Sequence, residues 1–476
     1  KRFLMNPGLS KYKHMLEKMF EQSKYTLNEE EEKILNLKSK SSYSDWVNMV
    51  SNFISKEERE IITEHGKKEK KNFSEITSLV SDSNKKVRDS AAKAFNDILA
   101  KHVDAAEAEI NAILGNKKVD DELRKMPRPD FSRHLRDDVD SNIVDTLINA
   151  VSKRFEISKK FYKLKARLLG LKKLEYHERN VSYGKLDKEY SYEEAVRLAY
   201  NVFNKLDSEF AEIFRMFNEN GYVDAFPKKG KKSGAFCAYW SITNPVYVLL
   251  NHTGKLEDVL TIAHEFGHAI NDELIRKKQN AMNYGTPTST AEVASTFMED
   301  FVLNELLKDA DDDLKLAIMM MKLNRDISSI QRQIACYMFE QELHKEYREK
   351  GYLSKDEIGK LFQKYMHAYM GEYVEESPGS ENWWVYWGHI RNFFYNYSYS
   401  SGLLISKSLQ NSVKKDPKFI DKVKEFMSTG LSDSPRNIFM KMGIDITKEE
   451  FWNKGLDEIE NNLKEAEKLA KKLGNI

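Results

Sequence analysis

Apolar residues recur at steps of three and four through most of the chain, which predicts a succession of amphipathic helices. Glycine and proline interrupt this spacing at Gly66, Gly115 and Pro127–Pro129 and predict where helices end. No fixed repeat length joins the helical segments, so a solenoid is not indicated. Before residue 180 the helical segments are Lys11–Phe20, Glu29–Leu37, Ser44–Ile54, Lys85–Leu99, Asp104–Leu114 and Ile143–Leu169.

Two short runs have the pattern of strands, Ala235–Trp240 and Val246–Leu250, with Asn244-Pro245 in the turn between them. They carry the only convincing β signal in the chain. The charged run Lys67–Lys71, elsewhere in the chain, is interpreted as the solvated end of a helix. We therefore expect a mainly helical protein with one small sheet.

A polar stretch around His177–Tyr192 separates the first group of helices from the rest of the chain. We expect a domain boundary there, with an N-terminal helical domain at 1–180 and a second domain at 181–476. The sequence opens with Lys1 rather than Met, so we expect the first domain to be truncated at its start.

The composition narrows the class of protein. Of 476 residues 41% are hydrophobic and 32% charged, with 9 Pro and 21 Gly, which is typical of a helix-rich soluble protein. The net charge of +1 gives no indication of a nucleic-acid or membrane-surface partner. The two cysteines, Cys237 and Cys336, form no disulfide framework, which favours a reducing, cytoplasmic setting. No apolar run is long enough for a membrane span, and no signal-peptide pattern is present.

One further helix, predicted at Lys255–Arg276, contains His264-Glu265-Phe266-Gly267-His268, which fits the pattern H-E-x-x-H. Residues four apart on a helix lie nearly above one another, about 6 Å along the axis. Both imidazoles can therefore reach one zinc ion, while Glu265 projects beside it towards a water molecule. The alternative is a pair of histidines in ordinary hydrogen bonds on a buried helix.

A catalytic zinc site usually has three protein ligands. A metzincin would need glycine and histidine three and six residues beyond His268, where the chain has Asn271 and Leu274. Glu292, 24 residues after His268, is the better candidate. However, Ser289-x-x-Glu292 is also a capping-box pattern at the start of a helix, so spacing alone leaves ligand and cap open.

Longer blocks surround these residues. They are Gly234-Ala235-Phe236-Cys237, Asn251, Gly254 and Asp258-Val259, His264 to Ala269, Ala291 to Glu299, and Gly388 to Tyr399. Together they resemble the oligoendopeptidase F / thimet oligopeptidase family of zinc metallopeptidases, strongly from Gly234 to Leu306 and moderately around His389–Gly402.

The resemblance implies roles for individual residues. It implies that Glu292 is the third zinc ligand and that Glu299, on the same helix face, accepts a hydrogen bond from a ligand imidazole. It also implies that His389 and tyrosine hydroxyls stabilise the oxyanion of the tetrahedral intermediate.

Within that tyrosine block, Tyr395 and Tyr399 share a face and are the candidates, while Tyr397 points elsewhere. Arg391 departs from the family pattern, in which an aromatic residue is usual. The other aromatic residues of this region are assigned to the core, namely Trp383, Trp384, Trp387, Phe393 and Phe394.

The first of the two predicted strands, with the glycine before it, is the expected substrate-binding element. Its candidate residues are Gly234, Ala235, Phe236 and Cys237. An exposed strand edge can pair with the main chain of an extended peptide. The cationic loop Lys228–Gly234 is interpreted as a connector, with a role in holding a substrate carboxylate as the alternative.

The sequence as a whole predicts a zinc-dependent endopeptidase that hydrolyses internal bonds of short oligopeptides, with one Zn²⁺ per chain held by residues 181–476. Glu265 is the expected general base. The resemblance implies a helical clamshell around a deep channel. Two alternatives remain, namely a helical zinc carboxypeptidase that releases C-terminal dipeptides and a catalytically dead peptide-binding scaffold.

Overall fold

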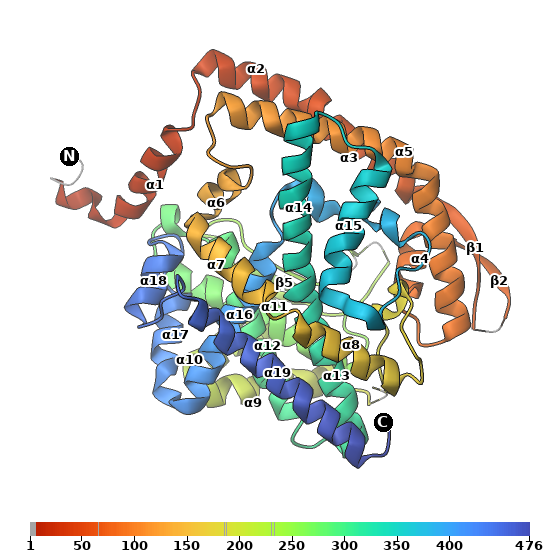
Figure 1. The fold of residues 1–476 in the computed structure, drawn as a ribbon. Helices are drawn as coiled ribbons and strands as arrows, with labels where there is room; N and C mark the ends of the chain where they lie inside the picture. The colour runs from red at the N-terminus through yellow and green to blue at the C-terminus, as the bar shows by residue number, and fades with distance from the viewer. Residues whose placement is uncertain (1–5, 65, 185, 187, 230, 233) are drawn as a thin grey trace.

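The computed structural model describes residues 6–64, 66–184, 186, 188–229, 231–232 and 234–476, most of them in helices (Figure 1). The helices before residue 180 are α1 (Lys13–Ser23), α2 (Glu29–Ser39), α3 (Asp45–Ser55), α4 (Phe73–Leu79), α5 (Lys85–Leu123), α6 (Phe131–Asp137), α7 (Ser141–Ser152) and α8 (Glu156–Leu168).

The remaining helices surround the motif. They are α9 (Tyr192–Leu206), α10 (Ser208–Glu219), α11 (Leu256–Lys278), α12 (Ala291–Leu306), α13 (Asp312–Ser329), α14 (Gln331–Lys350), α15 (Lys355–Met370), α16 (Tyr397–Lys415), α17 (Ile420–Met427), α18 (Pro435–Lys441) and α19 (Glu449–Lys472). The predicted mainly helical fold is confirmed.

The predicted helix boundaries are wrong in two places, and in the first of them the helices expected at Lys85–Leu99 and Asp104–Leu114 form one helix, α5. Helix α5 runs without a break through Gly115, because a single glycine costs a helix only about 1 kcal/mol and the flanking apolar positions are buried. Conversely, the segment predicted as one helix at Ile143–Leu169 is divided into α7 and α8 by a turn at residues 153–155. Burial against neighbouring helices decides both cases.

The run Lys67–Lys71 is not a helix end, and the expectation that β structure occurs in one place only is also wrong. Strands β1 (Glu58–Ile62) and β2 (Lys68–Asn72) form an antiparallel hairpin. Its faces are mostly charged, so the alternation of apolar and polar residues is hidden. Pairing of opposite charges, such as Lys70 Nζ to Glu58 Oε2 at 2.5 Å, and burial of Ile61 accompany the hairpin.

The second sheet has the strands β3 (Val223–Asp224), β4 (Phe236–Ala238) and β5 (Tyr247–Leu249) in the order β3-β5-β4. Strand β5 is parallel to β3 and antiparallel to β4. Strands β4 and β5 confirm the two predicted runs in shortened form. Because β5 is the central strand, β4 is an edge of the sheet, and it packs beside α11.

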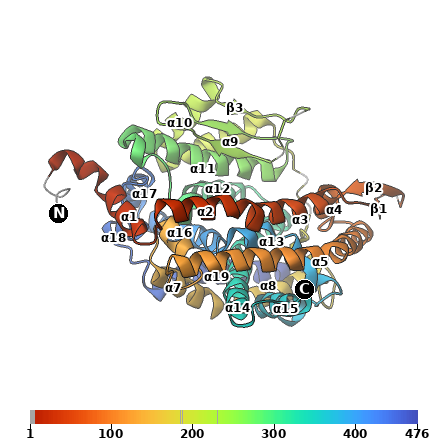
Figure 2. The same cartoon turned by 90° about the horizontal axis from the view of Figure 1, so that it is seen from above.

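Helix α11 is held between two layers. Figure 2 shows α9, α10 and β3 on one side of it and α12 on the other, with α16 and α13 beyond α12. Its apolar stripe, which includes Leu260, Ala263 and Phe266, is fully buried. The rings of Phe214 and Phe266 lie 4.3 Å apart, which fixes α10 against the motif helix.

Glycine allows α12 to approach α11 closely. A Cβ atom at Gly267 would lie 2.5 Å from Ser295 Cα and 2.7 Å from the carbonyl oxygen of Ala294. A second glycine, Gly402 of α16, faces α12 in the same way, since its added Cβ would lie 3.1 Å from Glu292 Cβ. The three helices α11, α12 and α16 thus stack through positions without side chains.

Hydrophobic residues from both sides of residue 180 belong to one buried cluster. Helix α19, for example, packs on α7 and α8 as well as on α13 and α16. The division into domains at 1–180 and 181–476 stays a prediction. Among the described residues, we find no helix with the length and apolar character required to cross a membrane.

We predict that Gly267→Ala destabilises the protein by about 1–3 kcal/mol or more, because the new methyl group meets backbone atoms that cannot move aside. Gly115→Ala in α5 is the control, since its methyl group meets only the hydroxyl end of Tyr347. Chemical denaturation of the metal-free proteins measures both. A Gly267→Ala protein as stable as the Gly115→Ala protein would contradict the close packing of α11 on α12.

Candidate active site

The motif helix begins at a defined point. The Asp258 carboxylate accepts hydrogen bonds from the backbone N–H of Thr253, at 2.7 Å, and of Lys255, at 3.0 Å. These bonds satisfy donors that a helix start leaves free. One face of α11 is buried in the core. His264 and His268 therefore lie on the remaining face with side chains 25% and 23% exposed.

Glu292 of α12 lies against both imidazoles. Its Oε2 atom is 3.3 Å from His264 Nε2 and 3.6 Å from His268 Nε2, and the two rings are 5.1 Å apart. Ser295 Oγ donates a hydrogen bond of 3.0 Å to the same carboxylate oxygen. Two nitrogen atoms and one oxygen atom thus converge at one point on the surface of α11.

The capping box proposed for Ser289 and Glu292 is not formed. The N-cap of α12 is Thr290, which makes no side-chain cap, and Ser289 Oγ is buried without a hydrogen-bond partner. The Glu292 side chain turns towards the histidines instead. The geometry removes the alternative that spacing alone left open.

Glu299 bridges His264 of the motif helix and Arg325, a residue that no sequence pattern indicates. Its Oε2 atom is 3.2 Å from His264 Nδ1, and its Oε1 atom is 2.5 Å from Arg325 Nη1. His264 therefore has a carboxylate on each side of its ring. Arg325 lies on α13, and no local pattern connects it with the motif, so only the packing of α13 on the site reveals it.

The two carboxylates stabilise positive charge at this point. Burial lowers the pKa of His264, but hydrogen bonds to Glu292 and Glu299 outweigh it and raise the pKa to about 10. Burial likewise opposes ionisation of Glu292, yet the bonds to His264 and His268 bring its pKa well below the usual range. The same field would attract a divalent cation.

The donor set fits such a cation. The ligand atoms of His264, His268 and Glu292 all lie within 4.8 Å of one another. Two imidazoles and one carboxylate are a ligand set that catalytic zinc sites use, with a fourth position left for water or substrate.

Glu265 is 8% exposed beside this cluster, and burial raises the pKa of its carboxyl group. The backbone N–H of Cys237 donates a hydrogen bond to it. Strand β4, which contains Phe236 and Cys237, thus borders the site. Ala235 immediately precedes this strand, and the carbonyl oxygen of Gly234 accepts a 2.7 Å hydrogen bond from Asn251 Nδ2.

The cationic loop before this strand is used internally where the structure describes it. Lys231 Nζ donates to the carbonyl oxygens of Asp224 and Phe226, both at 2.8 Å. This position agrees with a connector. Gly230 and Ser233 lie outside the described residues.

The tyrosine block is folded as a short 3₁₀ helix, η9 (Gly388–Asn392), followed by a turn and α16. The His389 ring stacks on Tyr395 at 5.7 Å, and its Nε2 atom is 2.9 Å from Tyr399 Oη. Gly402, one turn beyond Tyr399, faces Glu292, so the packing of α16 on α12 brings this pair towards the metal cluster. Tyr397 points elsewhere, as predicted, and donates to Asp137.

Two other residues contact this block. Trp387 Nε1 donates a 3.1 Å hydrogen bond to His389 Nδ1, so its assignment to the core alone was incomplete. The guanidinium of Arg133, from α6, lies 4.9 Å from the Tyr395 ring. Trp387 is two residues from His389 in the sequence, but nothing in the spacing shows where an indole N–H points.

Arg391, where the family pattern has an aromatic residue, is buried and structural. Its Nε and Nη2 atoms donate to the Glu109 carboxylate at 3.0 and 2.7 Å, and Nη1 donates to the Trp384 carbonyl oxygen. Arg391 therefore connects the tyrosine block, Gly388–Tyr399, to Glu109 of α5.

The turn after Arg391 is strained. Phe393 and Phe394 have φ angles of 35° and 58°, which residues other than glycine rarely adopt. Buried Glu340 of α14 accepts the Phe394 N–H at 2.7 Å and Asn396 Nδ2 at 2.8 Å. These bonds hold the turn that precedes Tyr395.

A second cluster of possible metal ligands, Asp89, His177 and Glu178, is already neutralised by the protein. The Glu178 carboxylate accepts from Arg88 Nη2 at 2.7 Å and from Lys85 Nζ at 3.1 Å. Such an arrangement is an ion-pair network and needs no metal.

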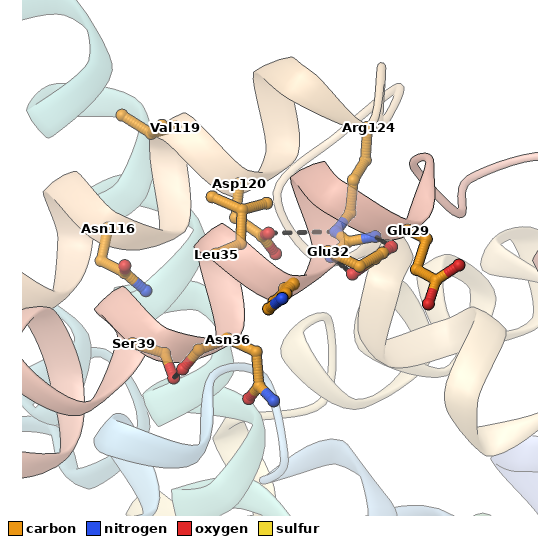
Figure 3. Close-up of a pocket in the computed structure, with 10 residues that line it drawn as sticks. Glu29, Glu32, Leu35, Asn36, Ser39, Asn116, Val119, Asp120 and Arg124 are labelled. Atoms are coloured by element: carbon orange, nitrogen blue, oxygen red, sulfur yellow. Dashed lines mark hydrogen bonds and ion pairs between the residues drawn. The ribbon is translucent and has the colours of Figure 1, made fainter.

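A separate cavity of about 590 Å³ lies between α2 and α5 (Figure 3). Arg124 crosses it and is bonded to Glu32, at 2.5 and 2.7 Å, and to Asp120. Hydrogen bonds from Arg124 and, to a lesser extent, from the backbone N–H of Leu27 lower the pKa of Glu32 to about 2. Arg124 thus pairs with both Glu32 and Asp120, and none of the candidate site residues lines the cavity.

Comparisons with known proteins match nearly the whole chain. The model described as peptidase family M3 matches residues 55–458, and the model described as oligopeptidase F matches residues 1–52. An oligoendopeptidase F homologue of Lactococcus lactis subsp. lactis is 26% identical over 481 residues, covering 98% of this chain and 78% of the relative. Oligopeptidase PepF of Bacillus subtilis is 24% identical, covering 98% and 70%.

Solved structures share the fold. A Chlamydophila abortus protein aligns with a TM-score of 0.90 at 23% identity, over 98% of this chain and 79% of its own. Oligoendopeptidase-F from Enterococcus faecium aligns with a TM-score of 0.78 at 18% identity, over 99% and 80%. The mainly helical architecture described above is therefore that of known proteins.

We predict a pH-dependent effect for Glu340→Gln. Burial raises the pKa of Glu340 to about 8, whereas an unfolded glutamate has a pKa of about 4.3. The folded protein therefore binds an extra proton between these values, and its free energy of unfolding falls as the pH rises through this window. The variant lacks this loss, so its stability relative to the parent should improve from pH 5 to pH 8.

Glu342→Gln on the same helix is the matched control. The pKa of Glu342 is lowered despite partial burial, by hydrogen bonds from Lys364 and Tyr365, so its contribution is constant above about pH 5. Urea denaturation of the metal-free proteins at several pH values gives the comparison. A difference between parent and Glu340→Gln that does not change with pH would contradict the prediction.

Proposed function

Since the chain belongs to peptidase family M3, whose members use a divalent metal, it is a metallo-oligopeptidase, and we propose that it cleaves internal bonds of short peptides with one zinc ion. One observation carries the proposal, namely the Glu292 oxygen between the Nε2 atoms of His264 and His268. The names of the relatives support the preference for internal bonds. Free thiols at Cys237 and Cys336 support a reducing, cytoplasmic location.

In the proposed mechanism His264, His268 and Glu292 hold the zinc. When bound, zinc supplies a Lewis acid that lowers the pKa of water to about 7 and polarises a carbonyl group. Glu265 takes the proton of the attacking water and passes it to the leaving amine, as a general base and then a general acid. Its burial and the Cys237 N–H fix the carboxylate in place.

The remaining proposed roles concern orientation and charge. Glu299 orients His264 through Nδ1, and Arg325 holds Glu299. The pair His389 and Tyr399, with Tyr395 against it, supplies a hydrogen-bond donor to the oxyanion. Residues Gly234 to Cys237 at the sheet edge bind the main chain of an extended peptide.

We predict that the zinc-loaded protein cuts short peptides of a mixed library at internal bonds, and that a chelator stops this, as mass spectrometry of the products can show. Glu265→Gln should bind zinc with parental affinity but lose about 10²–10⁴-fold in turnover, because the general base is absent. Release of C-terminal dipeptides alone would establish a carboxypeptidase instead. No cutting by the zinc-loaded parent would favour a binding scaffold.

We predict that Glu299→Gln lowers zinc affinity about 10–100-fold, because an amide holds the His264 imidazole less firmly than a carboxylate. Competition with a chromophoric chelator measures the affinity without any peptide. Glu305→Gln, on the same helix but paired with exposed Lys205 and Lys308, is the control and should leave the affinity unchanged. Equal affinities for both variants would exclude the proposed role of Glu299.

A further inference from the structure

The hydrogen bond between Trp387 and His389 determines where the imidazole carries its proton. Trp387 Nε1 lies 3.1 Å from His389 Nδ1, and an indole N–H can only donate. His389 Nδ1 is therefore an acceptor and carries no hydrogen. A neutral imidazole with a free Nδ1 carries its proton on Nε2, and this N–H then donates to Tyr399 Oη at 2.9 Å.

The surroundings of His389 keep it neutral. Burial lowers the pKa of His389, and the positive charge of Arg332 lowers it further. The Arg332 guanidinium lies 4.1 Å from the Trp387 ring, and among the described residues it has no carboxylate within ion-pair distance. A protonated His389 would lose the Trp387 bond and would face this cation.

The other groups around His389 do not offset this charge. The Tyr395 ring stacks on the His389 imidazole, with 5.7 Å between the ring centroids. The Tyr399 hydroxyl is hydrogen-bonded to the same imidazole. Arg133, another cation, lies against the Tyr395 ring and is paired with Asp137. Burial, then Tyr395 through its charge and a hydrogen bond, and the negative charge of Glu292 keep the Tyr399 pKa above its usual range, so its hydroxyl retains its proton.

The consequence concerns the direction of one O–H bond. Because Tyr399 Oη accepts from His389 Nε2–H, the Tyr399 hydrogen cannot point at His389. In the opposite tautomer Nε2 would be an acceptor and would draw that hydrogen to itself. The indole N–H of Trp387 selects between the two arrangements.

We propose that Trp387 is a positioning residue, which holds His389 in the Nε2–H tautomer and so keeps the Tyr399 hydrogen away from His389, able to turn from Tyr395 to the carbonyl oxygen of the bound peptide. This proposal rests on the proposed function and selects Tyr399 as the tyrosine that donates. It assigns to Trp387 a role through its single N–H, separate from the packing of its ring.

Trp387→Phe tests the proposal, because it removes the N–H and keeps an aromatic ring. Trp383→Phe is a matched control, since Trp383 is also 5% exposed and also donates one indole hydrogen bond, at 2.9 Å to Asn96 Oδ1. We expect kcat of Trp387→Phe on a fluorogenic peptide to fall about 10–100-fold, less than or equal to the loss of a whole oxyanion donor, with KM changed less than about threefold. Trp383→Phe should keep parental kcat and zinc content.

A spectroscopic readout separates this role from packing and from catalysis. In the zinc-loaded, peptide-free parent labelled with ¹⁵N-histidine, the His389 ring should show a protonated Nε2 and an unprotonated Nδ1, with the signal assigned by its absence in His389→Gln. In Trp387→Phe it should move towards the Nδ1–H tautomer. An Nδ1–H or imidazolium form in the parent overturns the proposal, even if the variant fails to fold or the protein proves not to be a peptidase.

A double-mutant cycle completes the test. The amide nitrogen of a glutamine at position 389 can donate where Nε2–H does, but it has no tautomer to be selected. In the His389→Gln background, adding Trp387→Phe should therefore change kcat less than about twofold. An equal loss in both backgrounds, or parental kcat in the single variant, would overturn the role of Trp387.

Discussion

The close approach of three helices at positions without side chains is the constraint on which the site depends. Gly267 lets the backbone of α12 reach α11, and Glu292, one turn before Ser295, thereby reaches both histidines. Gly402 does the same for α16, which carries Tyr399 one turn earlier. The metal cluster and the candidate oxyanion donors are thus registered against each other by backbone contact, which is stiffer than contact between flexible side chains.

Several buried carboxylates behind the histidines form ion pairs with basic side chains. Glu299 lies between His264 and Arg325, and the next residue, Asp300, pairs with Lys322 at 3.1 Å. Fully buried Lys407 is 2.9 Å from Asp326. Glu299, which faces His264, is therefore backed by Arg325, and the buried carboxylates of Asp300 and Asp326 are paired with lysines of the protein.

The sequence predicted those parts of the site that rest on short-range periodicity. The motif helix, the helix of Glu292 and the edge strand were found because three- and four-residue spacing or alternation marks them. The β1–β2 hairpin escaped, since its charged faces hide alternation, and the roles of Arg325 and Trp387 escaped because they depend on how helices pack and where one N–H points. Spacing also left Glu292 undecided between cap and ligand, and only the structure, in which Ser289 forms no cap and Glu292 turns towards the histidines, removes the cap.

The bond between Arg391 and Glu109 has a consequence for how the protein can vary and be divided. The two residues are separated by 282 positions, and both are buried. Removal of one partner of a buried pair leaves an uncompensated charge, at a cost of about 3–5 kcal/mol. Replacing either residue alone is therefore costly, whereas replacing both together avoids an unpaired buried charge. A fragment that began near residue 181 would contain Arg391 but lack Glu109. The helices before residue 180 thus act as a folding partner for the segment that carries His389.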